Sequence, residues 1–346
     1  MQIRSFSVLP LPVILVYKVL FMPCARLAPS FRERFAWYMY DWSNSAFTTS
    51  ALAMFAPILY SNLFGPSFFS YYVSMSVIGQ CLVFIAVSSF ADYGSGRKFF
   101  FIGFSVAGCA CTCLMGNISS SSDKSLAATL LILANICYGA SFVFYNAYIP
   151  FLAESHEDVM TADAANKLVH QEHQLHSVYF LRCLMSLLQA VKRDVESRIS
   201  NTGYITGYCG GIIMTLIAVA VAFLNAAEST ATQREKDDAS NRSGRIVLVI
   251  VGIWWFCFSL FTFIRLGSHP GPSLPSMRAY LTLPWTRLFE TFRHIRELSH
   301  LGRYLLLYFF YSDGYNVIGS VCASISSALV AACTFCPCTM RIAFSF

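Results

Sequence analysis

Apolar residues in this chain come in long blocks, and this feature constrains the possible folds more than any other. A helix needs roughly 20 apolar residues to cross a hydrocarbon core about 30 Å thick. Because hydrocarbon offers no hydrogen-bond partners, each block must satisfy its own backbone as a helix. The sequence therefore predicts an all-α, polytopic membrane protein. Seven spans are expected, over residues 40–61, 71–91, 99–117, 127–152, 203–225, 246–265 and 304–333.

The charge content supports a membrane protein and argues against other classes. Charged residues make up 12% of the chain and apolar residues 56%, whereas soluble domains carry about 25% charged residues. The net charge of +6 does not indicate a nucleic-acid partner, because the basic residues lie in loops between apolar blocks. The expected partner is the lipid bilayer. No cofactor or metal is expected, and the absence of phosphate-loop, zinc-protease and nucleophile-elbow motifs predicts no enzyme activity.

Loop charges predict the orientation in the membrane. Sixteen Lys and Arg lie before span one and in the loops after spans two, four and six. The loops after spans one, three and five hold only 5. The positive-inside rule then places the N-terminus in the cytoplasm. The chain's two Asn-x-Ser sequons, at Asn117 and Asn241, both fall on the predicted non-cytoplasmic side.

Domain boundaries follow from these spans. The predicted units are an N-terminal segment 1–36, helices one to four over 37–152, a cytoplasmic loop with an amphipathic helix over 153–202, helices five and six over 203–265, a central cytoplasmic loop 266–302, and helix seven with an atypical end over 303–346.

An acidic residue at the mouth of the first span is the main candidate for chemistry. Asp41 and Asn44 lie one helical turn apart in an aromatic segment. A charge at the centre of a membrane helix costs roughly 2.5–3.5 kcal/mol, so it usually has a function. The alternative is that Asp41 sits at the interface and only caps the helix. Asp313 and Asn316 repeat the spacing in the seventh span, which favours a role in binding substrate or coupling a proton.

Two further patterns indicate structural roles. The segment around Asp92, Arg97 and Lys98 suits a short hairpin whose charges join neighbouring helix ends, or simply a positively charged loop. Gly203, Gly207 and Gly211 recur at every fourth position of the fifth span, and this predicts close helix packing. Asn146, near the end of the fourth span, is a candidate for a hydrogen bond between helices or a substrate contact.

Several motifs, in order along the chain, resemble the autophagy-related vacuolar effluxers, a branch of the major facilitator superfamily. They are Trp37–Phe47, Ala91–Lys98, Tyr145–Leu152, Ser197–Gly211, Gly252–Trp255 and Tyr308–Asn316. The resemblance implies a major-facilitator helix bundle in a vacuolar, lysosome-like membrane. It also implies export to the cytosol of amino acids released by autophagic degradation.

The chain departs from this family in length, since a full member has about twelve spans. An alternative is therefore a truncated, non-transporting membrane protein that associates with a full-length relative. A seven-helix receptor is disfavoured, because such receptors begin outside the cell whereas the loop charges place this N-terminus inside.

Overall fold

A computed structural model describes residues 29–163, 178–228, 231–272, 276–294, 300, 302–312 and 314. Its regular elements are all helical. They are α2 (Pro29–Ala46), the π-helix η2 (Phe47–Phe55), α3 (Ala56–Phe64), α4 (Pro66–Asp92), α5 (Arg97–Met115), the 3₁₀ turn η3 (Ser121–Asp123), α6 (Lys124–Asn146), α7 (Ile149–Glu154), α9 (Val178–Leu224), α10 (Gln233–Arg265) and α11 (Met277–Arg293).

Six helical segments of the described chain are long and apolar enough to cross a membrane, and they correspond to the first six predicted spans. The all-α polytopic fold is thus confirmed. The seventh predicted span lies mostly outside the described residues, although 302–312 are helical. Asp313 and Asn316 also lie outside them, so the repeat of the Asp-x-x-Asn pattern stays a prediction.

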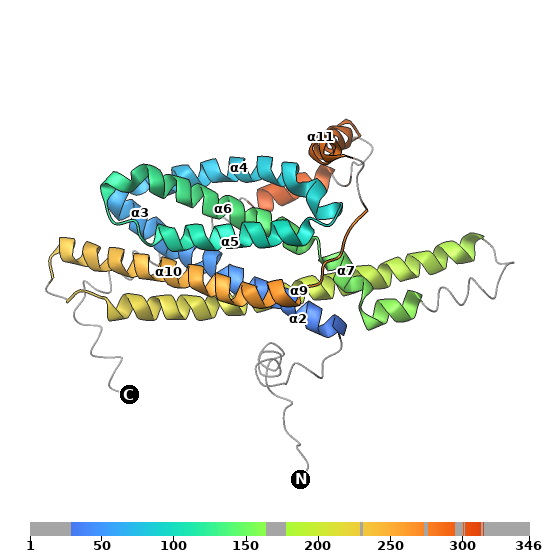
Figure 1. Ribbon diagram of the computed structural model, residues 1–346, viewed down its shortest axis with the longest axis horizontal. Coiled ribbons are helices and arrows are strands. Elements are labelled where there is room, and N and C mark those ends of the chain that lie inside the picture. The colour runs from blue at the N-terminus through green and yellow to red at the C-terminus, as the bar shows by residue number, and fades with distance from the viewer. Residues whose placement is uncertain are drawn as a thin grey trace, which may run out of the picture.

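The long helices lie side by side in one bundle (Figure 1). Helix α2 packs against both α9 and α10, α10 also packs against α5, α5 against α6, and α6 against α4. The short helix α11 lies at one end of the bundle, beside α4 (Figure 1). The first span is therefore covered on two sides by the fifth and sixth, and this buries the residues that α2 carries.

Helices α9 and α10 extend beyond the predicted spans. Helix α9 is continuous across the predicted boundary between 202 and 203, and its first half projects past the bundle (Figure 1). Helix α10 begins at Gln233 because Thr232 and Glu235 form a capping box. In that box the Glu235 carboxylate accepts a 2.7 Å hydrogen bond from the Thr232 amide. Local capping starts this helix in a polar segment where hydropathy shows no span.

This extension changes the reading of the second sequon. Asn241 lies inside α10 and its side chain accepts a 3.0 Å hydrogen bond from Asn62, while Ser243 is buried. A glycosylation acceptor needs an accessible loop. Asn241 therefore stands in a helix, whereas the predicted spans place it in a loop before residue 246.

The first and fourth spans are interrupted helices. The first changes from α-helix to a nine-residue π-helix at Phe47 and back at Ala56. The fourth breaks at Ala147 and Tyr148, and Pro150 stands in the first turn of the short helix that follows. A proline tolerates this position because its missing N–H needs no partner there.

Candidate functional site

Asp41 and Asn44 are both enclosed by the bundle. The Asp41 side chain is 5% exposed and that of Asn44 is fully buried. No Lys, Arg or His in the described part of the chain forms an ion pair with Asp41. Both amide atoms of Asn44 also lack a hydrogen bond to any described residue. Since unpaired buried polar groups are costly, the pair is better suited to holding a ligand or a proton than to stabilising the fold.

Helix α9 approaches these residues along its glycine face. A β-carbon added to Gly203 would lie 2.7 Å from the Trp37 ring, and one on Gly211 would lie 2.8 Å from Thr49. Between them, Gly207 meets the Asp41 carboxylate. The predicted close packing of the three glycines is present, and it brings the α9 backbone against the acid.

Aromatic rings of α2 and α6 form the adjacent wall. Trp37 stacks on Tyr145 with ring centres 4.1 Å apart, and its Nε1–H donates a 2.9 Å hydrogen bond to the Tyr145 carbonyl oxygen. The Tyr145 hydroxyl is buried without a described partner. A β-carbon on Gly203 would lie 3.1 Å from the Tyr145 hydroxyl oxygen, which places this ring one helical turn along α9 from the contact of Gly207 with Asp41. A carboxylate among aromatic faces suits an ammonium group, because both attract cations.

The neighbouring Tyr40 differs from Tyr145, because its hydroxyl has hydrogen-bond partners. The Tyr40 hydroxyl donates to Ser141 at 2.7 Å and lies 2.9 Å from the Ser105 hydroxyl. Asn146 ends α6 and is half-buried, and no hydrogen bond links its side chain to Asp41 or Asn44. The geometry therefore brings together Asp41, Asn44 and the aromatic wall, but not Asn146.

A second polar cluster closes one end of the bundle, at the loop between α4 and α5. Arg97 is 3% exposed, and it donates to the carbonyl oxygens of Ala91 at 2.6 Å and of His269 at 3.2 Å. Its guanidinium also lies over the Phe151 ring, 4.2 Å from the centroid. Lys98 donates to the Leu266 carbonyl oxygen at 2.6 Å.

Lys98 thus binds the end of α10, and Arg97 links the end of α4 to the segment that follows α10. Asp92 is exposed and forms no ion pair with a described residue.

Sequence reasoning missed two members of this cluster. Glu33 accepts hydrogen bonds from the Gly267 amide and from His269 Nε2, both at 2.7 Å. Glu33 is the single acid of a basic stretch before the first span. A lone acid among basic residues could have marked Glu33 as a residue with a specific partner. Nothing in the nearby sequence indicated that this partner is His269, 236 residues further along the chain.

Comparison with known proteins identifies the family. The family described as "Vacuole effluxer Atg22 like" matches residues 65–335 of this chain. The chain belongs to the Atg22-like vacuole effluxer family. The match begins just after the first span, so Asp41 and Asn44 lie outside the matched residues and their assignment rests on geometry. No solved structure matches the chain.

Curated fungal relatives agree with this family. Autophagy-related protein 22-2 of Aspergillus clavatus is 29% identical over an alignment 289 positions long, gaps included, which covers 72% of this chain and 45% of the relative. Autophagy-related protein 22 of Pyricularia oryzae is 26% identical over an alignment 352 positions long, gaps included, which covers 82% of this chain and 50% of the relative. Autophagy-related protein 22 of Yarrowia lipolytica is 29% identical, and the alignment covers 73% of this chain and 47% of the relative. The chain thus spans about half the length of the curated relatives it matches.

Proposed function

We propose that this multi-pass membrane protein acts in secondary transport as part of a vacuolar effluxer and moves amino acids from the vacuole to the cytosol. The observation that carries the proposal is Asp41, a buried carboxylate without a cationic partner among the described residues. Membership of the Atg22-like family supports it. Substrate binds between two halves of the transporter, and rocking of one half against the other exposes it to each side in turn.

Asp41 has two possible partners in this mechanism. It attracts the ammonium group of an amino acid, or it takes up the proton that drives transport. Asn44 orients the bound group through its unpartnered amide, and the stacked rings of Trp37 and Tyr145 hold the cation by its attraction to their faces. In this proposal Asp313 and Asn316, in the predicted seventh span, supply the matching pair.

The test is flux in vesicles that contain the purified chain and carry a pH gradient. Asp41→Asn keeps the shape of the side chain and removes its charge, so amino-acid flux driven by the gradient is expected to fall to background. Asp123→Asn, in the polar turn that precedes α6, is the matched control and keeps normal flux. Normal flux in a folded Asp41→Asn protein would show that the Asp41 charge is not needed for transport.

A second candidate is association with a full-length relative without transport by this chain alone. The observation that favours it is the apolar face that α9 leaves uncovered beside the site, where Tyr208, Ile212 and Leu216 are each at least 60% exposed. Co-purification of the tagged chain with a full-length relative, together with absence of flux from the chain alone, supports this candidate. Flux from the chain alone contradicts it.

The proposed orientation has the N-terminus in the cytoplasm, as the loop charges indicate. An N-terminal epitope tag is then accessible to antibody outside intact isolated vacuoles. A tag that is protected until the membrane is permeabilised would reverse the orientation.

A further inference from the structure

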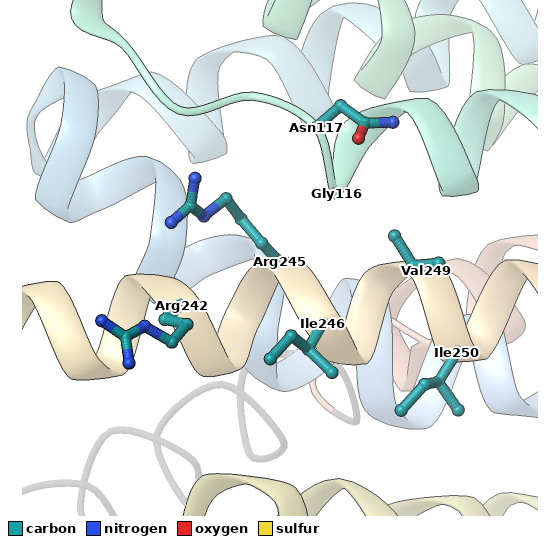
Figure 2. Close-up of a pocket in the computed structure, with 7 residues that line it drawn as sticks. All are labelled: Gly116, Asn117, Arg242, Arg245, Ile246, Val249 and Ile250. Carbon is teal, nitrogen blue, oxygen red and sulfur yellow. The ribbon is translucent and has the colours of Figure 1, made fainter. Parts of the chain in front are cut away.

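A groove lies at the end of the bundle opposite the α4–α5 loop. It has a volume of about 360 Å³ and is lined by Gly116, Asn117, Arg242, Arg245, Ile246, Val249 and Ile250. Figure 2 shows both arginines extending from α10 toward the start of that helix, with Asn117 across from them at the end of α5. Ile246 and Ile250 continue from the arginines along the opposite side of α10 (Figure 2).

The two arginines have no anionic partner within the described chain. Neither guanidinium forms an ion pair or hydrogen bond with a described residue, and no acid lines the groove. Asp238 precedes Arg242 by one helical turn but is exposed and makes no ion pair with it. The groove therefore presents two positive charges, and the planar guanidinium groups match the geometry of a phosphate.

The level of the arginines along α10 identifies the source of that phosphate. Arg265 ends α10, and it follows Arg245 by roughly 20 residues, which at 1.5 Å per residue is about 30 Å. This is the thickness of the hydrocarbon core. When Arg265 lies at one membrane surface, Arg242 and Arg245 lie at the headgroup level of the other. The isoleucines of the groove then begin the acyl-chain region.

We infer that this groove binds an anionic phospholipid. The phosphate accepts hydrogen bonds from Arg242 and Arg245, Asn117 contacts the headgroup, and one acyl chain lies along Ile246 and Ile250. A soluble phosphate would contact only the arginines, whereas a phospholipid contacts the arginines with its phosphate and the isoleucines with its acyl chain. Asp41 does not line the groove, so the inference stands independently of the transport proposal.

Native mass spectrometry of the full chain tests the inference. The purified protein is loaded with phosphatidylinositol and phosphatidylcholine in equal amounts, and retained lipid is measured. Wild type is expected to prefer phosphatidylinositol by at least about tenfold, because both lipids carry a phosphate but the choline cation of phosphatidylcholine is repelled by the two arginines. R242Q/R245Q is expected to lose this preference. R234Q/R293Q removes the same net charge at exposed positions outside the groove and is expected to keep it.

Three results would overturn the inference. They are equal retention of both lipids by wild type, an unchanged preference in R242Q/R245Q, and loss of the preference in R234Q/R293Q. Competition with millimolar inorganic phosphate separates the two sources of the anion. Continued retention of phosphatidylinositol supports a lipid site, whereas its displacement assigns the groove to soluble phosphate and overturns the lipid assignment.

Discussion

The Asp41 carboxylate lies against the backbone of Gly207. A β-carbon on Gly207 would stand 2.9 Å from Asp41 Cγ and 3.1 Å from Oδ2, and 2.6 Å from the Ser45 hydroxyl oxygen. The absence of a side chain at Gly207 therefore sets the position of the acid between α2 and α9. The packing of these two helices and the geometry of the candidate site depend on the same contact.

Gly207→Ala is expected to destabilise the protein by about 1–3 kcal/mol, because the new methyl group overpacks a close helix contact. It is also expected to displace the Asp41 carboxylate and reduce transport. Thermal unfolding in detergent measures the first effect and vesicle flux the second.

Gly103→Ala is the matched control, since nothing lies within 4 Å of a β-carbon at Gly103. Its expected effect is within about 1 kcal/mol, the ordinary difference between glycine and alanine in a helix. Equal stability of Gly207→Ala and Gly103→Ala would mean that α2 and α9 can move apart to accept the methyl group without a loss of stability.

Arg97→Lys is expected to lower the free energy of unfolding by about 2 kcal/mol, although it keeps the positive charge. Lysine lacks the planar fork that donates to both the Ala91 and His269 carbonyl oxygens, and hydrogen bonds from charged groups are each worth roughly 1.5–3 kcal/mol. Thermal unfolding checks this, with exposed Arg278→Lys as the neutral comparison. A wild-type unfolding temperature in Arg97→Lys would show that the charge alone suffices.

Gly94→Ala is expected to be more damaging than Gly65→Ala, although both glycines have positive φ, at 73° and 100°. Gly65, with ψ 160°, lies outside the left-handed helical region, and such positive-φ backbone costs a non-glycine residue roughly 1–3 kcal/mol at each site. At Gly94 the new β-carbon would also lie 2.6 Å from the Tyr280 hydroxyl oxygen, whereas the space at Gly65 is open.

Unfolding temperatures of these two variants measure the difference. Adding Tyr280→Phe to Gly94→Ala is expected to restore the steric part of the loss and leave the backbone part. If Gly65→Ala is as unstable as Gly94→Ala, the loss of stability in Gly94→Ala comes from its backbone conformation and not from the contact with Tyr280.

His156 is expected to make the protein less stable in mild acid. Burial and the nearby Arg34 lower the pKa of His156 below its ordinary value of 6.5, and Asp158 opposes them. The Asp158 amide also donates to His156 Nδ1 at 3.2 Å, which requires that nitrogen to be unprotonated. The unfolded chain therefore binds the proton first. The free energy of unfolding falls as pH drops through 6.5 toward the folded-state pKa.

The measurement is the change in unfolding temperature between about pH 7.5 and about pH 5.5, which brackets the histidine range. His156→Gln is expected to show a smaller loss than wild type because glutamine does not titrate. An identical loss in both proteins would place the pH sensitivity in other groups.

The sequence by itself determined the secondary structure of the membrane spans, because hydrocarbon leaves each apolar block no alternative to a helix. The glycine spacing on α9 likewise predicted close packing, since periodicity places Gly203, Gly207 and Gly211 on one face. The ends of α9 and α10 were harder to predict, because capping and polar contacts beyond the apolar blocks extend both helices.

Only the tertiary structure decided which partners these helices meet. Gly207 faces Asp41, and Glu33 binds His269 at a separation of 236 residues. Local patterns carry no information about such pairs, because the bundle's packing order brings them together. The predicted spans placed Arg242 and Arg245 in a loop, whereas the structure places them on α10, and only the packing of α10 on α5 brings them beside Gly116 and Asn117.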